Sequence, residues 1–183
     1  VHGMPLATAL AEDNLECKIK EISSEESDSW RKLKNTGGIT PKIAAEDIVF
    51  YGVRDTEDPE DQIIARRNIK NITVEEFRSK GVLKSVEEGL QLLNDCDIIY
   101  ISFDVDSMDP SLTSHGTGTP VPNGFSPEEA NDLIQGLLSS EKIVCFEMVE
   151  INPLLDEKKN TMAEISFSIL EDTTNSIEKQ HIS

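Results

Sequence analysis

The sequence predicts an α/β fold in which a mostly parallel sheet lies between helices. Three short apolar segments, at residues 48–53, 98–103 and 143–146, lack the alternation of polar and apolar residues that a half-exposed strand shows. Segments with helical spacing of apolar residues separate them. Strands that alternate with helices in this way are typical of a parallel sheet. We therefore expect strands that are buried on both faces.

The first part of the chain predicts a helix, a surface segment and a strand. Residues 5–11 are rich in helix-forming residues, and Pro5 suits the first helical turn. Residues 12–40 are acidic and rich in serine, so we expect them to form a surface excursion, which Trp30 anchors to the body of the domain. Gly37 and the residues after it mark a turn before the strand at 48–53.

The middle of the chain alternates loops, an extended piece and helices. A polar loop is expected at residues 54–59, and a short extended piece at 69–72. Thr73 and Glu76 match a capping box, in which a hydroxyl and a carboxylate satisfy the first amide groups of a helix. A second helix is expected from about residue 82 to 93, directly before the central strand.

The last third predicts two further helices around the third strand. A loop rich in Gly, Thr and Pro at residues 111–124 precedes Ser126 as a cap, Pro127 in the first turn and Glu129, which completes a capping box. The helix that follows carries one apolar stripe, made by Ala130, Leu133, Ile134, Leu137 and Leu138. Residues from Thr161 onward have helical spacing and predict a C-terminal helix that covers the sheet.

Composition narrows the class of protein. The chain has 183 residues and 37% hydrophobic residues, enough for one domain with a sizeable core. A formal net charge of −18 argues against nucleic acid and against an anionic membrane as partners. The cysteines Cys17, Cys96 and Cys145 are odd in number and widely spaced, which favours reduced thiols and a cytoplasmic location.

Two carboxylates at the end of the central strand are the first candidate site. Asp104 and Asp106 follow residues 98–103, and the carboxyl end of a strand is where open α/β sheets place ligands. Residues two apart on an extended segment point to the same side, so both side chains can face one spot. Like charges so close repel unless a cation lies between them. A divalent metal ion is therefore the expected ligand.

Two other interpretations of this segment were weighed. Asp104 and Asp106 can instead be solvated loop carboxylates, and the triplet alone leaves both interpretations open. A calcium loop of the EF-hand type is excluded, because its third ligand, turn glycine and closing glutamate would be Met108, Asp109 and His115.

Four segments together resemble a known enzyme family. Residues 102–110 (SFDVDSMDP) and 116–120 (GTGTP) resemble the second metal-binding signature of the ureohydrolases, which include arginases, agmatinases and formimidoylglutamases. Residues 2–5 and 147–153 resemble arginases in particular. The resemblance implies a three-layer αβα fold with a mostly parallel sheet. Because the family's first metal-binding half has no counterpart here, we expect residues 1–183 to be the C-terminal part of a single catalytic domain.

The resemblance also implies a reaction and a cofactor. In the full-length protein, two Mn²⁺ ions sharing a hydroxide would hydrolyse L-arginine to L-ornithine and urea. Asp104 would bridge both ions and Asp106 would bind one of them. Since the other ligands are missing, we expect the 183-residue chain alone to be inactive. Family resemblance further implies a homo-oligomer, as a trimer or a hexamer.

The remaining candidate residues also come from the resemblance. Glu150 would hold the guanidinium group of the substrate, and Thr119 would lie near it. His2 would carry a proton to the departing amine. Asp55 and Asp58 would meet the α-amino group of the substrate.

The loop after Asp55 is one residue longer than in the family, so the carboxylate that faces the substrate is either Glu57 or Asp58. Asp58 is favoured because Pro59 follows it. Two alternative functions remain open at this point: an agmatinase or other ureohydrolase, and a truncated, non-catalytic paralogue that acts as a binding or assembly subunit.

Overall fold

A computed structural model describes residues 4–13 and 18–182, with side chains as far as residue 180. The chain divides into two compact units. The first consists of Val1–Ile48 and Thr56–Lys70, and the second of Val49–Asp55 and Asn71–Ser183.

Helices make up most of the first unit. Helix α1 (Pro5–Ala9) confirms the predicted N-terminal helix. Helix α2 (Ser24–Lys34) lies within the acidic segment, where no helix was predicted. It begins with a capping box, because Ser23 Oγ accepts the Glu26 amide at 3.1 Å and the Glu26 carboxylate accepts the Ser23 amide at 2.9 Å. None of the residues of α2 is buried, so local capping rather than packing explains this helix.

The expected polar loop around Asp58 is wrong in part, because Asp58 begins helix α3 (Asp58–Arg67). Pro59 occupies the first helical turn, where its missing amide has no cost. Glu60 reaches back and accepts the Glu57 amide at 2.8 Å. Acidic residues in the first turn also favour the helix, since they complement its dipole.

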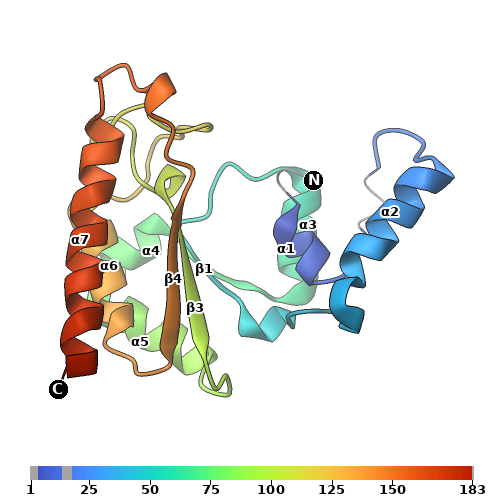
Figure 1. The fold of residues 1–183 in the computed structure, drawn as a ribbon, viewed down its shortest axis with the longest axis horizontal. Coiled ribbons are helices and arrows are strands. Elements are labelled where there is room, and N and C mark those ends of the chain that lie inside the picture. Colours follow the sequence, from blue (N-terminus) through green and yellow to red (C-terminus); the bar gives the residue numbers. More distant parts are fainter. Residues whose placement is uncertain (1–3, 14–17, 183) are drawn as a thin grey trace. The chain divides into compact units, whose positions relative to one another are not determined.

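The second unit contains the strands, apart from Lys70 at the start of β2, and four of the α-helices of the described residues (Figure 1). Strands β1 (Val49–Tyr51) and β2 (Lys70–Ile72) form one pair, and β3 (Ile99–Asp104) and β4 (Ile143–Val149) form another. Strands β3 and β4 are parallel, as predicted. The helices of this unit are α4 (Val74–Lys80), α5 (Val82–Leu92), α6 (Pro127–Leu138) and α7 (Thr161–Ile182).

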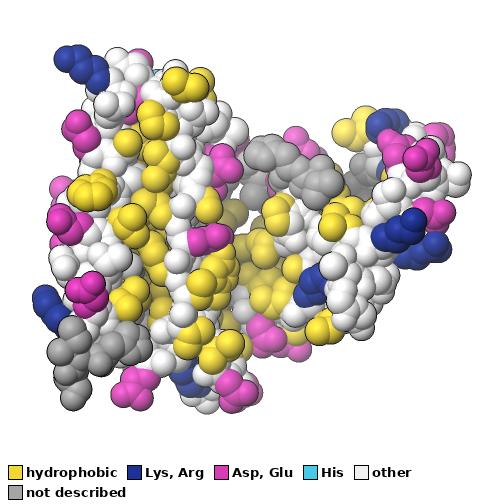
Figure 2. Space-filling model, in the orientation of Figure 1, with side chains coloured by type: hydrophobic (Ala, Val, Ile, Leu, Met, Phe, Trp, Pro, Cys, Tyr) yellow, Lys and Arg dark blue, Asp and Glu magenta, His cyan; other side chains and the backbone are white. Residues whose placement is uncertain are grey.

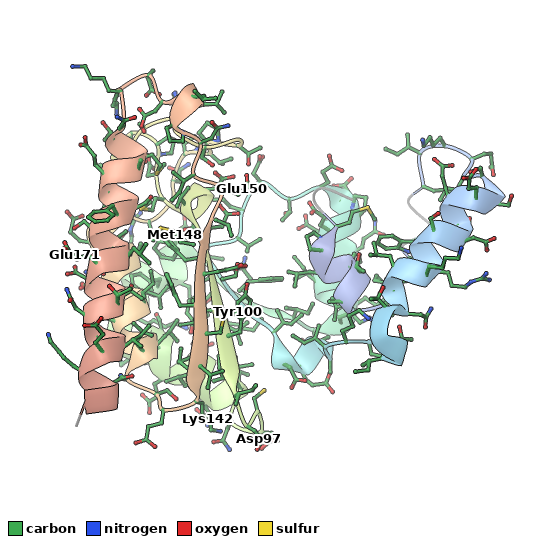
Figure 3. The ribbon with its side chains drawn as sticks, viewed as in Figure 1. Asp97, Tyr100, Lys142, Met148, Glu150 and Glu171 are labelled. Carbon is green, nitrogen blue, oxygen red and sulfur yellow. The ribbon has the colours of Figure 1, made fainter. Side chains whose placement is uncertain are left out.

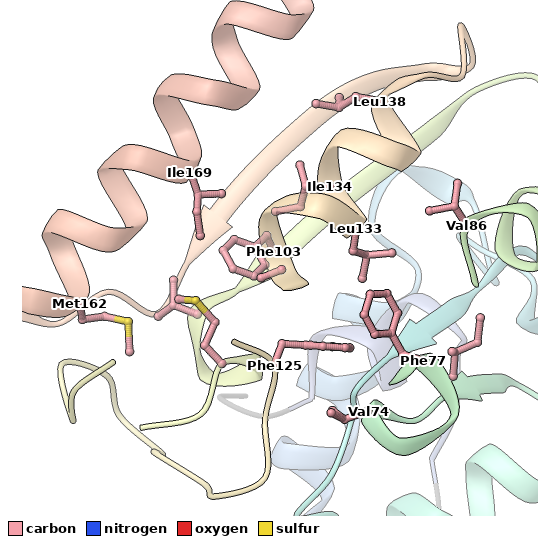
Figure 4. Packing of buried hydrophobic residues seen from close by; sticks show 14 residues of the cluster. Val74, Phe77, Val86, Phe103, Phe125, Leu133, Ile134, Leu138, Met162 and Ile169 are labelled. Carbon is pink, nitrogen blue, oxygen red and sulfur yellow. The ribbon is translucent and has the colours of Figure 1, made fainter. Parts of the chain in front are cut away.

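The hydrophobic core lies where α6 and α7 cover the β3–β4 pair (Figure 4). Four residues of the predicted stripe on α6 are buried, namely Ala130, Leu133, Ile134 and Leu138. The fifth, Leu137, is partly buried and packs against this core. Phe77 and Phe125 meet edge to face, with ring centroids 5.1 Å apart. The capping box of α6 is confirmed, since Ser126 Oγ accepts the Glu129 amide at 3.1 Å.

The prediction that the strands are buried on both faces is wrong for the central pair. Along β3, Ile99 and Phe103 are buried, but Tyr100 is 51% exposed. Val144 on β4 is 59% exposed, and Figure 2 shows hydrophobic side chains at the surface over the strands and α7. The reason is that α6 and α7 cover only one side of this pair within the described residues.

None of the helices in the described part of the chain is long and apolar enough to cross a membrane. Helix α7 has 22 residues, but polar side chains interrupt its apolar positions. Ser166 and Thr173 lie on its buried side, and their hydroxyl oxygens have no hydrogen-bond partner.

This arrangement predicts that Thr173→Val stabilises the protein. The substitution keeps the shape of the side chain and removes a buried hydroxyl without a partner, so the free energy of unfolding should rise by about 1 kcal/mol. Urea unfolding followed by circular dichroism measures this change. The exposed neighbour Thr174 is the matched control, and Thr174→Val should shift stability by less than about 0.5 kcal/mol. A loss of stability in Thr173→Val would show that its hydroxyl is satisfied.

Candidate functional site

The candidate site lies where β3 and β4 end. Asp104 is the last residue of β3 and pairs in register with Val149, the last residue of β4. Glu150 therefore leaves the sheet beside Asp104, and Figure 3 shows it at the end of β4 beyond Met148. The carboxyl ends of parallel strands are the usual ligand edge of such sheets.

Asp104 and Asp106 do not lie on one extended segment, contrary to our expectation. Residues Val105–Ser107 form a 3₁₀ turn, and Asp104 Oδ1 accepts the Asp106 amide at 2.8 Å. Ser107 Oγ donates to the Asp104 carbonyl at 2.6 Å. An Asp side chain that bonds the backbone two residues ahead favours a turn over a continuing strand.

The loop at residues 111–124 returns to this turn and meets Asp106. Thr117 Oγ1 donates to Asp106 Oδ1, and Thr119 Oγ1 donates to Asp106 Oδ2. Each carboxylate oxygen of Asp106 thus accepts a hydroxyl from a different threonine. Hydroxyl groups on both oxygens fix the plane of the carboxylate.

Carboxylate groups crowd this edge of the sheet. The pKa of Asp104 is raised to about 6, mainly by burial and in addition by the charges of Asp106 and Glu150, while the bond from the Asp106 amide acts in the opposite direction. Asp106 and Glu150 thus each lie close enough to Asp104 to repel its carboxylate. A cation placed among them would relieve this repulsion.

Glu150 is exposed and has a backbone φ of 68°. This left-handed conformation is uncommon outside glycine and is found at functional sites more often than elsewhere. A Cβ built on Gly118 would lie 3.6 Å from Glu150 Oε2, so the loop runs directly beside this carboxylate. The Asn152 amide also donates to the Gly116 carbonyl at 2.8 Å, which joins the loop to the segment after β4.

Three further predicted residues lie elsewhere along the chain. Asp55 follows β1, is exposed and has φ 56°, also in the left-handed region. Asp58 is the first residue of α3 in the first unit. His2 lies outside the described residues.

The described residues fit only part of a metal centre. Among them, no group of three or more His, Cys, Asp or Glu side chains is arranged to hold a metal ion. Asp104 and Asp106 supply oxygen ligands of the kind that Mn²⁺ or Mg²⁺ prefers, and repulsion among their charges favours a cation. A complete centre needs ligands beyond these two.

Sequence reasoning missed three residues that organise this site. Thr117 received no role, although it stands two residues from Thr119 in the same Gly/Thr run. Asp109 received none either; its carboxylate accepts the Ser111 amide at 2.8 Å and the Asn123 amide at 2.7 Å, which closes the base of the loop. The third is Arg54, whose acceptors are 52 to 68 residues away along the chain in all but one case.

The fold is that of an α/β protein, and acidic side chains gather at the ends of its parallel strands. A family model described as the Arginase family matches residues 1–174. The chain belongs to the Arginase family.

Individual relatives agree with this assignment. The chain is 35% identical to an arginase from Bacillus subtilis over 161 residues, which are 88% of this chain. It is 30% identical to an arginase from Brevibacillus brevis over 171 residues, which are 93% of this chain. It spans about half the length of these relatives, 49% and 51%.

A solved structure of an arginase from Helicobacter pylori superposes with a TM-score of 0.82 at 30% identity, over 94% of this chain and 56% of that one. The observed elements therefore form part of an arginase-like αβα fold.

The packing of the loop yields a prediction for two glycines. Gly116 is enclosed, since a Cβ there would lie 2.6 Å from Met162 Cβ and 2.9 Å from Asp156 Oδ2. Gly116→Ala should therefore destabilise the protein by about 1–3 kcal/mol, because the neighbours must move apart. Gly118→Ala is the matched control, because its closest atom is 3.6 Å away, and it should be nearly neutral. Thermal unfolding of both variants measures the difference, and equal midpoints would contradict this packing.

Proposed function

We propose that the complete protein is an arginase, a hydrolase that converts L-arginine to L-ornithine and urea with two Mn²⁺ ions. The observation that carries this proposal is the convergence of Asp104, Asp106 and Glu150 at the strand ends of a chain in the Arginase family. The relatives described above, all named arginases, support it.

Asp104 and Asp106 are the proposed metal ligands. Two divalent ions held near each other lower the pKa of water enough to supply a nucleophile at neutral pH. Thr117 and Thr119 keep the Asp106 carboxylate in one orientation through their hydroxyl groups. This support matters because groups behind a metal ligand tune its affinity.

Glu150 is the proposed partner of the substrate guanidinium. A carboxylate accepts two parallel N–H bonds from this planar group, an arrangement that fixes orientation as well as position. Its carboxylate is exposed and stands beside Gly118. The negative charges around it also favour a cationic substrate.

Three further roles are proposed on the family resemblance. Asp55 and Asp58 would contact the α-amino group of the substrate, and Thr119 would lie near its guanidinium in addition to supporting Asp106. His2 would carry a proton to the departing amine, since imidazole titrates near neutral pH.

The organisation of the complete protein is also a proposal. Residues 1–183 would form part of a single catalytic domain, with residues 12–40 as an acidic excursion. The protein would be cytoplasmic and would assemble as a homo-oligomer of three or six copies.

The decisive experiment measures urea release by the protein expressed from its complete gene. With Mn²⁺ present, L-arginine should be the preferred substrate, and removal of the metal with a chelator should abolish turnover. Agmatine, which lacks the carboxylate of arginine, is the comparison substrate. Preferential turnover of agmatine would replace the arginase assignment by an agmatinase.

A substitution tests the role of Glu150. Glu150→Gln should lower kcat/KM for L-arginine by about 10- to 100-fold, because a hydrogen bond to a charged group contributes about 1.5–3 kcal/mol. Glu147→Gln is the matched control, since Glu147 is exposed on the same strand and accepts a bond from Ser102 Oγ instead. We expect the control to retain activity within twofold. Equal rates in both variants would remove Glu150 from the substrate site.

A non-catalytic assembly subunit is the second candidate. It is favoured by the finding that no three metal-ligating side chains cluster within the described ranges. A complete protein that binds no Mn²⁺ and releases no urea would favour this candidate, whereas Mn²⁺-dependent turnover would exclude it.

A further inference from the structure

The guanidinium group of Arg54 contacts an unusual set of acceptors. Arg54 follows β1 and is half-buried. Its N–H groups donate to six backbone carbonyl oxygens. Five of these bonds are 2.9 to 3.4 Å long, and the bond to Val121 is shorter. The acceptors belong to Gly52, Asp106, Ser107, Met108, Val121 and Pro122.

These acceptors lie on two segments that have to meet at the site. Three of them form the turn that carries Asp106, and two belong to the loop that carries Thr117 and Thr119. The position of the loop relative to this turn decides whether the two hydroxyls reach Asp106. Arg54 joins the two segments through their backbone carbonyl oxygens alone.

A glycine shows how closely the two segments approach around this arginine. A Cβ built on Gly124 would lie 2.5 Å from the Ser107 carbonyl oxygen and 2.6 Å from Arg54 Nη2. The loop backbone thus packs directly against both the turn and the guanidinium group. This contact is independent of the hydrogen bonds and indicates the same close fit.

The chemistry of the side chain explains why arginine suits this place. Guanidinium is planar and presents five N–H donors in a rigid fork, so it can serve carbonyls on several sides at once. Carbonyl oxygens that converge on one point repel one another, and the positive charge offsets this repulsion. A lysine ammonium carries the same charge on a single atom and lacks the span of the fork.

We propose that Arg54 is a positioning residue for the metal-binding carboxylates, an inference that rests on the proposed function. It fixes the turn at Val105–Ser107 against the loop at 121–122, and it thereby keeps Asp106 between its two threonines. Arg54 touches neither substrate nor metal in this role. Its loss lowers metal affinity because Asp106 and Asp104 no longer share one fixed arrangement.

The test compares Arg54→Lys with the wild type in the protein expressed from its complete gene. Mn²⁺ affinity is measured by titration with electron paramagnetic resonance, and circular dichroism verifies the fold. Arg54→Lys keeps the charge and removes the fork, so we expect Mn²⁺ affinity to fall by about 10- to 100-fold, the range typical of residues behind metal ligands. The spectrum of the bound ion should also change, because its ligands are less fixed.

Arg78→Lys is the matched control. Arg78 also donates to a loop carbonyl, that of Gly124 at 3.0 Å, but its other partner is Glu129 and it does not contact the turn. The Arg78→Lys protein should bind Mn²⁺ with an affinity within twofold of the wild type. Gly124→Ala is a second variant, which displaces the guanidinium group but keeps its charge. Like Arg54→Lys, it should lower the affinity for Mn²⁺.

The outcomes separate this inference from the proposed function. A folded Arg54→Lys or Gly124→Ala protein that binds Mn²⁺ within twofold of the wild type would overturn the positioning role alone. Equal losses in the Arg54 and Arg78 variants would overturn it as well, because the effect would then be general. A wild-type protein that binds no Mn²⁺ would overturn the proposed function and this inference with it.

Discussion

Repulsion among three carboxylates at one edge of the sheet is the constraint on which the site depends. Parallel strands place Asp104 and Glu150 side by side, and the turn after β3 adds Asp106. The raised pKa of Asp104, about 6, reflects both its burial and these neighbouring charges. The surrounding fold has to hold Asp104 in place, because a half-buried carboxylate beside two like charges would otherwise turn toward water.

The loop at residues 111–124 supplies much of that support, and two further carboxylates give the loop its shape. Asp109 accepts bonds at both ends of the loop, and hydrogen bonding, first from the Ser111 side chain, lowers its pKa. Asp156 accepts the Ser114 hydroxyl at 2.8 Å and the Met162 amide at 2.9 Å, which ties the loop to the start of α7. Part of the acidic composition therefore serves to organise backbone rather than to charge the surface.

Backbone strain occurs at two of the residues to which we assign substrate contacts. Asp55 and Glu150 both have positive φ, at 56° and 68°, and Glu150 comes directly after β4. A left-handed conformation costs a residue with a Cβ roughly 1–2 kcal/mol. At Glu150 the chain leaves β4 and presents a carboxylate at its end, so the strain accompanies the placement of charge.

The sequence by itself determined the elements that depend on local signals. The apolar runs of β3 and β4, the capping box and stripe of α6, and the position of Asp104 at a strand end all follow from short-range patterns. Capping signals are also present in the sequences of α2 and α3. Because the residues around them are acidic and polar, these segments were interpreted as a surface excursion and a loop instead of helices.

Only the tertiary structure decided which side chains support the carboxylates and which strand faces are covered. Thr117 is 11 residues from Asp106, and the Arg54 acceptors on the turn and loop are 52 to 68 residues away along the chain. Such contacts depend on how an irregular loop folds back. No periodic pattern encodes that path, because each of its bonds depends on the others being formed.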